Sequence, residues 1–321
     1  MRIAVTGATG FLGRRVVEQA AQRGHQVVAT GRGITGPGDF GGRANFMRCD
    51  LADAEGLARV FDGCEAIVHS AALSSDWGPE SAFERTNVEG TRNVVAAAER
   101  AGVRRLVHVS STSVYFAFED RLNLAEGAPL PRPVNAYART KRAAEEVARG
   151  FGGEVFVARP RGLFGPGDPH LLPRLLKVAE RRPLPLLRGG GAKVDITDIS
   201  VAADAMLAMA EADASTAGTY NVSHGEPIEI RALVERLFSG LKREVRWRAM
   251  PAPVVLGGAR LLELLARTSG RPPLVTAYAL GLFAFSQTLD LTNIGQRLGW
   301  KPALGRDEAI ERTIAASRVL M

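Results

Sequence analysis

Short apolar runs alternate with amphipathic windows through the first half of the chain. The runs that predict strands cover residues 2–5, 26–30, 45–48, 66–69, 105–110 and 154–160. Windows with helical spacing lie between them, at 13–24, 54–61, 81–101 and around Tyr137. Strands that alternate with helices pair in parallel through right-handed crossovers. The order therefore predicts an α/β fold with a doubly wound parallel sheet.

The pattern changes after Pro160, where Gly- and Pro-rich pieces are mixed with helical patches. One further strand is predicted at 218–222. We therefore expect a sheet domain made of residues 1–162 plus about 196–223. A smaller, discontinuous C-terminal lobe would then be made of about 163–195 and 224–321, and we expect it to bind the substrate.

Charge and cysteine content narrow the class of protein. The net charge is +7, but Lys and Arg are scattered and no nucleic-acid-binding motif accompanies them, so we expect no nucleic-acid partner. Cys49 and Cys64 show neither a CxxC spacing nor a neighbouring His cluster. This predicts no disulfide framework and no metal site, and it favours a cytoplasmic location.

No stretch of the chain predicts a transmembrane segment. The N-terminus lacks the apolar run of a secretion signal, so we expect none. The apolar run at 274–285 has 12 residues, too few to cross a bilayer. We interpret it as a core or dimer helix, with a lid over an apolar substrate as the alternative.

Three glycines follow the first strand and open the first helix. Gly7, Gly10 and Gly13 lie in the sequence VTGATGFLG. A pyrophosphate can rest on a helix N-terminus only where the backbone comes close, and glycines lack the Cβ that would prevent this. The strand before and the helix after indicate a Rossmann-type dinucleotide site.

The ends of the next strands suggest which dinucleotide binds. Arg32 follows the second strand, where an NAD-preferring site usually offers a carboxylate. A guanidinium can bind a 2′-phosphate, so NADP(H) is preferred and NAD(H) is possible, unless Arg32 is an ordinary loop arginine. Asp50 and Leu51 end the third strand, where an adenine ring could rest. His69 is expected to be packed or hydrogen-bonded and not to act as a base.

Hydroxyl groups and a Tyr–Lys pair follow the fifth strand. Residues 110–113 read SSTS, at the strand end where ligands bind in such sheets, although Ser and Thr are also common in turns. Tyr137 and Lys141 are four positions apart in a helical window. On its own this spacing fits an exposed helix pair equally well.

Together these motifs resemble those of the extended short-chain dehydrogenase/reductases. The matching stretches are TGxxGxxG at 6–13, DL at 50–51, SAA at 70–72, NVEGT at 87–91, SSTSVY at 110–115, YxxxK at 137–141, RPRGLFGPGD at 159–168 and LDLTNIGQRLGWKP at 289–302. The branch that the chain resembles is the 3β-hydroxysteroid dehydrogenase-like one. The stretches at 77–91, 194–197 and 271–292 carry that likeness.

The resemblance implies a mechanism. Tyr137 would exchange the proton, Lys141 would favour its phenolate and bind the nicotinamide ribose, and Ser111, with Thr112 as the backup, would donate to the substrate oxygen. The residues expected to bind the dinucleotide are Gly7, Thr9, Gly10, Phe11, Leu12, Gly13, Arg32, Asp50, Leu51, Ser70, Ala71, Ala72, Asn87, Ser110, Tyr137, Lys141 and Pro160. Family members commonly form homodimers through helices at about 82–101 and 136–150.

Three functions remain open at this stage. The preferred one is an NADP(H)-dependent oxidoreductase acting on an apolar secondary alcohol or ketone, steroid-like or a long-chain β-hydroxy/β-keto compound. The second is a nucleotide-sugar epimerase or dehydratase with tightly bound NAD. Arg32, Phe116, Lys193 and Ser200 depart from the residues typical of those enzymes. The third is a non-catalytic dinucleotide-sensing protein, which would not need Ser111, Tyr137 and Lys141 together.

Overall fold

The computed structural model describes the whole chain except residues 34–39, 41, 170, 270–271 and 320–321. Its main element is a seven-stranded sheet in which every neighbouring pair is parallel. The strands, in spatial order, are β12 (Gly218–Val222), β7 (Glu154–Pro160), β5 (Arg105–Val109), β4 (Ala66–His69), β1 (Arg2–Thr6), β2 (Gln26–Gly31) and β3 (Asn45–Arg48). The order reverses between β1 and β4, so the prediction of a doubly wound α/β sheet is confirmed.

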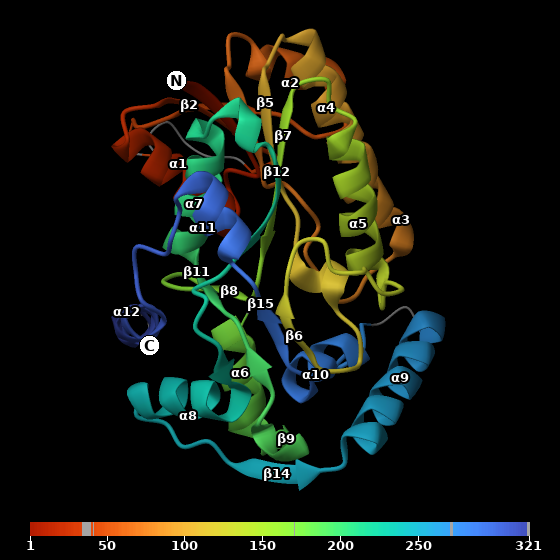
Figure 1. Ribbon diagram of the computed structural model, residues 1–321. Helices are drawn as coiled ribbons and strands as arrows, with labels where there is room; N and C mark the ends of the chain where they lie inside the picture. Colours follow the sequence, from red (N-terminus) through yellow and green to blue (C-terminus); the bar gives the residue numbers. More distant parts are fainter. Residues whose placement is uncertain (34–39, 41, 170, 270–271, 320–321) are drawn as a thin grey trace.

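Helices cover both faces of this sheet (Figure 1). One face packs on α1 (Phe11–Gln22) and α7 (Ile199–Glu211), and the other on α2 (Ala54–Phe61), α4 (Gly90–Arg100) and α5 (Ala136–Arg149). Successive strand residues point to opposite faces, so Ile3 and Val5 enter the first core and Ala4 the second. Apolar strands therefore become the middle layer of three.

The helix predicted over 81–101 contains a local irregularity. It begins as α3 (Glu80–Phe83), continues through a π-helical segment at Glu84–Glu89 and joins α4 directly. Such π-turns often occur at functional sites. Here the π-helical segment carries Asn87, one of the residues expected at the cofactor site.

Shorter elements build the C-terminal lobe, at the bottom of Figure 1. A four-stranded sheet has the order β13 (Ile228–Glu229), β10 (Lys193–Val194), β15 (Gln287–Leu289) and β6 (Arg121–Leu124). Two-stranded sheets pair β11 (Thr197–Asp198) with β8 (Leu163–Phe164) and β14 (Trp247–Met250) with β9 (Leu184–Leu187). The helices of this lobe are α6 (Leu171–Arg181), α8 (Ile230–Gly240), α9 (Ala252–Ser269), α10 (Ala277–Ala284) and α12 (Arg306–Val319). Helix α11 (Thr292–Leu298) instead packs against the main sheet at β12. The exact boundaries predicted between the two units stay a prediction.

The apolar run at 274–285 forms α10, which packs against α9. Ala277, Leu280 and Ala284 are buried in one cluster with Leu256 and Ala259 of α9. This agrees with the interpretation of the run as a core helix. No helix among the described residues has the length and apolarity needed to cross a bilayer.

Candidate active site

The glycine turn after β1 is shaped to accept an anion. Gly7 has φ +68° and accepts a hydrogen bond from the Gly10 N–H at 2.9 Å. Helix α1 then begins at Phe11, and Gly10 before it offers no capping side chain. The first turn of α1 carries no acidic residue. Free N–H groups and the helix dipole therefore favour negative charge at this point.

Close approach of the backbone explains why this turn needs glycines. A Cβ on Gly13 would lie 2.1 Å from the Gly7 carbonyl oxygen, and a Cβ on Gly7 would lie 2.8 Å from the Ala71 Cα. The turn therefore packs directly against α1 and against the segment after β4. This cradle fits the diphosphate of a dinucleotide.

The end of β4 is tied to β1 by hydrogen bonds. Ser70 Oγ donates to the Thr6 carbonyl at 2.7 Å, and the Ala71 N–H donates to Thr6 Oγ1 at 3.3 Å. His69 contacts Thr6 through Nδ1 at 2.7 Å and Thr91 through Nε2 at 3.0 Å. Burial and the nearby Lys141 lower the His69 pKa from 6.5 to about 3. The ring is neutral and held in place, as expected for a structural histidine.

The residues predicted to bind the adenosine half lie at the ends of β2 and β3. Arg32 directly follows β2 and is exposed. Asp50 is exposed as well, and its Oδ1 accepts a hydrogen bond from the Ala52 N–H at 2.9 Å. The half-buried Leu51 packs against Gly90, which has no room for a side chain there. These placements match the strand ends on which the prediction was made.

Ser111 and Tyr137, the two hydroxyl groups of the predicted triad, meet. Ser111 lies between β5 and a short 3₁₀ segment, Thr112–Tyr115, where its Oγ accepts from the Ser113 N–H at 3.1 Å and lies close enough to Tyr137 to affect the pKa of the phenol. Tyr137 lies in the first turn of α5, which Asn135 caps by accepting from the Ala138 N–H at 2.8 Å. Burial raises the pKa of the Tyr137 phenol above its usual 10.0, and the neighbouring Ser111 hydroxyl opposes this rise. The phenol is therefore held protonated.

Lys141 lies one helical turn beyond Tyr137 and is almost fully buried. Its Nζ donates to the Val109 carbonyl at 2.5 Å, which anchors α5 to the end of β5. Burial lowers the Lys141 pKa from 10.5 to about 8, and the charge of Glu145 acts in the opposite direction. Lys141 therefore stays largely cationic at neutral pH and titrates within the working range of an enzyme.

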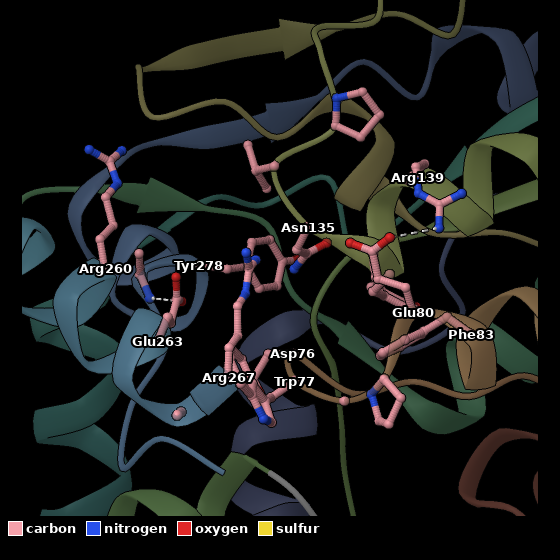
Figure 2. A pocket seen from close by; sticks show the side chains of 18 of the residues that line it. Asp76, Trp77, Glu80, Phe83, Asn135, Arg139, Arg260, Glu263, Arg267 and Tyr278 are labelled. Atoms are coloured by element: carbon pink, nitrogen blue, oxygen red, sulfur yellow. Dashed lines mark hydrogen bonds and ion pairs between the residues drawn. The ribbon is translucent and has the colours of Figure 1, made fainter. Parts of the chain in front are cut away.

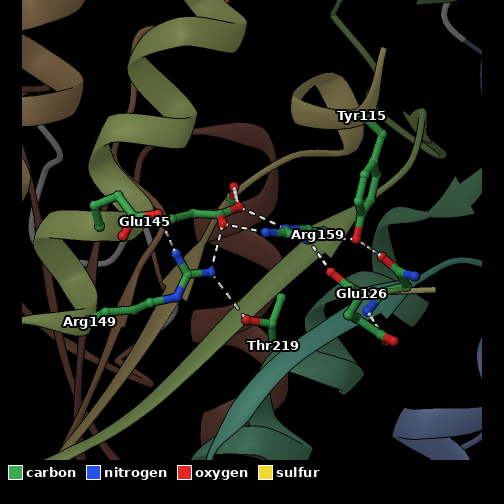
Figure 3. Close-up of polar contacts among 9 residues, drawn as sticks. Tyr115, Glu126, Glu145, Arg149, Arg159 and Thr219 are labelled. Atoms are coloured by element: carbon green, nitrogen blue, oxygen red, sulfur yellow. Dashed lines mark hydrogen bonds and ion pairs between the residues drawn. The ribbon is translucent and has the colours of Figure 1, made fainter. Parts of the chain in front are cut away.

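A buried ionic network supports this end of α5 (Figure 3). Glu145 accepts from Arg159 Nε at 2.8 Å and Nη2 at 2.5 Å, from Arg149 Nη2 at 2.9 Å and from Ser110 Oγ at 2.5 Å. Burial alone would raise the Glu145 pKa, but the hydrogen bonds and charge of Arg159 hold it below its usual 4.5. Ser110, predicted to bind cofactor, thus directs its hydroxyl to Glu145.

Asn87 and Thr112 use their side chains within the protein. Asn87 accepts from the Leu73 N–H at 2.7 Å and donates to Thr140 Oγ1 at 3.0 Å, so it connects the loop after β4 to α5. Thr112 Oγ1 donates to the carbonyl of Pro160, the last residue of β7, at 3.4 Å. Thr112, the predicted backup to Ser111, therefore already directs its hydroxyl to the backbone.

A cavity of about 780 Å³ opens beside Tyr137 (Figure 2). Apolar side chains contribute to its lining, among them Trp77, Phe83, Phe118 and Val134. Arg260, Glu263 and Arg267 reach it from α9, and Arg139 and Glu80 lie on the opposite side. A cavity of this size holds a small-molecule ligand.

Sequence reasoning missed several side chains that shape this region. Tyr278 of α10 lines the cavity and packs edge-on against Phe116, with ring centroids 5.1 Å apart. Arg161 is buried beyond the end of β7. Glu145, four residues after Lys141, could have been found from its helical spacing. No local pattern distinguishes Tyr278 or Arg161.

The match to a family of known proteins decides what this arrangement is. Residues 3–223 match the model described as the NAD dependent epimerase/dehydratase family. The chain belongs to this family. The match spans the glycine turn, Ser111, Tyr137 and Lys141. As a member of the epimerase/dehydratase family it is an NAD(P)-dependent enzyme of the extended short-chain dehydrogenase/reductase type.

Two relatives indicate the branch of the family to which the chain is similar. The chain is 33% identical to 2-alkyl-3-oxoalkanoate reductase of Stenotrophomonas maltophilia, over 99% of each protein. It is 28% identical to sterol-4-alpha-carboxylate 3-dehydrogenase, decarboxylating, of Homo sapiens, over 99% of this chain and 89% of that protein. The resemblance to the 3β-hydroxysteroid dehydrogenase-like branch is thereby confirmed.

Solved structures in the epimerase/dehydratase family share the fold. MoeE5, solved in complex with UDP-glucuronic acid and NAD, superimposes with a TM-score of 0.79 over 100% of both chains at 23% identity. At this identity the likeness concerns the fold alone.

Proposed function

We propose that the protein is an NADP(H)-dependent oxidoreductase that interconverts a secondary alcohol and a ketone on an apolar substrate. The observation that carries the proposal is the placement of Tyr137 beside Ser111, on a cavity lined by apolar and charged side chains and one helical turn from a buried Lys141. The relatives named as a reductase and a dehydrogenase support the same chemistry.

Each of the three side chains has a distinct task. The bound nicotinamide supplies the hydride for reduction or accepts it in oxidation. Tyr137, held protonated, donates its proton to the ketone oxygen as negative charge develops there. Ser111 donates a hydrogen bond to the same oxygen. Lys141 as a cation lowers the energy of the phenolate that Tyr137 becomes.

The preference for NADP(H) rests on Arg32. Gly31 and Arg32 stand where a carboxylate would select NAD, and an exposed guanidinium suits a 2′-phosphate. The other residues predicted to bind cofactor keep that role in the proposal, with Ser110 and Asn87 acting through the neighbours they hydrogen-bond.

The names of the relatives suggest a finer substrate class. A 2-alkyl-3-oxoalkanoate and a sterol-4-alpha-carboxylate with a reacting C3 both carry a carboxylate on the carbon next to the reacting one. We propose the same relationship in the substrate of this protein, on a long-chain or polycyclic apolar body.

Two variants test the function. Tyr137→Phe should reduce the turnover of a β-keto ester by at least about 100-fold while leaving NADPH affinity nearly unchanged, because only the proton donor is removed. Arg32→Ala should remove most of the preference for NADPH over NADH, measured by quenching of protein fluorescence. Turnover of UDP- or dTDP-sugars alone would instead support an epimerase or dehydratase. Tighter binding of NADH by the unmodified protein would contradict the cofactor preference.

We further propose a cytoplasmic homodimer that forms through the helices at about 82–101 and 136–150. Light scattering coupled to size exclusion would measure its mass. A monomer at micromolar concentration would contradict this assembly.

A further inference from the structure

Besides the cavity at Tyr137, here the first cavity, a second cavity of about 970 Å³ lies in the C-terminal lobe. Strands β9 and β14 and the first turns of α9 contribute its walls, in the lower part of Figure 1. Most of the side chains that line it are apolar, including Leu186, Met250, Leu256 and Phe285. A cavity of this size and composition suits an apolar small molecule.

The charged side chains of the second cavity already contact other groups of the protein. Among its described lining residues these are Arg188 and Arg260. Arg188 donates to the two carboxylate oxygens of Asp120 at 2.8 and 2.7 Å and lies over the Phe285 ring at 5.1 Å. Arg260 lies over the Phe118 ring at 4.9 Å. These lining residues therefore offer little to an anion and favour an uncharged alkyl chain.

One face of α9 runs along both cavities. Pro253, Leu256 and Arg260 line the second cavity. Arg260, Glu263 and Arg267 line the first cavity (Figure 2). Their alternating spacing of three and four residues places all of them on one stripe of the helix. The stripe is about 21 Å long at about 1.5 Å per residue, so a ligand lying along it reaches from one cavity to the other.

A row of aromatic rings also joins the two cavities. Tyr278, which lines the first cavity, packs edge-on against Phe116 with ring centroids 5.1 Å apart. Phe116 packs in the same way against Phe118 at 5.3 Å, and Phe118 against Phe285 at 6.2 Å. Phe118 lines both cavities and Phe285 the second. Apolar surface is therefore continuous between the two.

The boundary between the cavities is formed by Phe118 and Arg260, the two residues that line both of them. Arg260 is exposed, and Figure 2 shows it at the margin of the first cavity, on the side of α9. A cation–π contact at an exposed site is weak, because water competes for the cation. The guanidinium can therefore move aside, and an alkyl chain can pass along the Phe118 ring.

We propose that the second cavity binds the distal alkyl chain of a long-chain substrate whose carbonyl group reacts beside Tyr137. This inference rests on the proposed function and adds the site that selects chain length. The chain follows the stripe of α9 and the aromatic row, and its methylenes leave water as they enter. Each methylene buried in this way raises kcat/KM by up to about fourfold.

The test varies chain length in a series of methyl 3-oxo esters, from 3-oxobutanoate to 3-oxotetradecanoate. The consumption of NADPH is measured with each ester below its solubility limit. In every reaction the ketone carbon takes a hydride from NADPH and the ketone oxygen takes a proton through Tyr137, giving the alcohol and NADP⁺. For the unmodified enzyme, kcat/KM should rise by at least about 100-fold from 3-oxohexanoate to 3-oxododecanoate, mainly through KM.

Two tryptophan variants at neighbouring positions separate the second cavity from its surroundings. Pro253 is exposed in the first turn of α9 and lines the cavity, so Pro253→Trp fills part of its space. This variant should lower the ratio of kcat/KM for the long ester to that for the short ester by at least about tenfold. Val254 is 68% exposed and is not among the lining residues, so Val254→Trp is the matched control and should keep the ratio. A general loss of activity cancels in this ratio.

A binding measurement tests the second cavity independently of turnover. The methyl ester of cis-parinaric acid, a conjugated chain that fluoresces in apolar surroundings, should bind the unmodified protein in the presence of NADP⁺. Its affinity should fall by at least about tenfold in Pro253→Trp and stay unchanged in Val254→Trp. NADPH affinity, measured by quenching of protein fluorescence, should be equal in all three proteins and shows that each is folded.

The possible failures are distinguishable. If the esters are reduced but kcat/KM does not rise with chain length, or if Pro253→Trp keeps the full rise, the inference is wrong while the proposed function stands. A loss in Val254→Trp equal to that in Pro253→Trp is also evidence against the second cavity. If no ester is reduced in a Tyr137-dependent way but the probe binds and Pro253→Trp weakens it, the proposed function fails while the second cavity still binds an alkyl chain. If the probe does not bind either, both fail.

Discussion

Replacing Glu145 with glutamine tests how much the ionic network beneath the Tyr–Lys pair contributes to stability. Gln is nearly isosteric, and its carbonyl oxygen can still accept a hydrogen bond from Ser110. It cannot carry the charge that Arg159 faces. Both side chains are almost fully buried, with exposed fractions of 4% for Arg159 and 0% for Glu145.

The expected loss of stability follows from the surroundings that the substitution leaves to each partner of Glu145. Arg149 is 38% exposed, so water replaces much of its interaction. Arg159 keeps its hydrogen bonds to the Tyr115 hydroxyl at 2.6 Å and the Glu126 carbonyl at 3.1 Å but becomes an uncompensated buried cation. Breaking a buried pair in this way costs about 3–5 kcal/mol. That is a large fraction of the roughly 5–15 kcal/mol typical of a folded protein.

Urea unfolding at pH 7, followed by circular dichroism, measures the loss. Glu146 is the matched control, because it is adjacent on α5, pairs with Arg149 at 3.0 Å and is 68% exposed. Glu146→Gln should change the free energy of unfolding by less than about 1 kcal/mol.

The pH dependence provides a second measurement. The pKa of Glu145 in the folded protein lies below 4.5. Its contribution to the free energy of unfolding is therefore fully present above about pH 4.5 and is lost as the pH falls through the folded-state pKa. The difference in the free energy of unfolding between the unmodified protein and Glu145→Gln should therefore become smaller at acidic pH. A loss below about 1 kcal/mol at pH 7, or one equal to that of Glu146→Gln, would refute the reasoning.

Three further predictions concern the glycine turn, Lys141 and His69. Gly7→Ala should weaken NADPH binding by at least about tenfold, because a Cβ there meets Ala71 at 2.8 Å. Gly24→Ala, also at positive φ but with open space around it, is the control that isolates the backbone cost of about 1–2 kcal/mol. The rate of ketone reduction should fall as the pH rises through about 8, where Lys141 loses its charge, and a flat profile to pH 10 would contradict this. The His69 ring should show no NMR titration between pH 5 and 8, because its folded pKa is about 3, whereas a midpoint near 6.5 would show that it is accessible. Since the unfolded ring binds a proton below about pH 6.5 and the folded ring does not, this histidine makes stability fall as the pH drops below that value.

The sequence alone was sufficient for the sheet and the cofactor end. Each predicted strand, including residues 218–222, is present in the seven-stranded sheet, because apolar runs between amphipathic helices carry their signal locally. The glycine turn was likewise predictable from sequence, because its strand, turn and helix are consecutive in the chain. Tyr137 and Lys141 were found through helical spacing together with their surrounding motifs.

Only the tertiary structure decided which partner each polar side chain of the site contacts. Ser110 and Ser111 are neighbours in sequence, yet one hydroxyl donates to Glu145 and the other accepts from the Ser113 N–H beside Tyr137. The pairing of Glu145 with Arg159 depends on how α5 packs against β7. Burial and hydrogen bonding are properties of contacts between distant segments, and no local pattern encodes them.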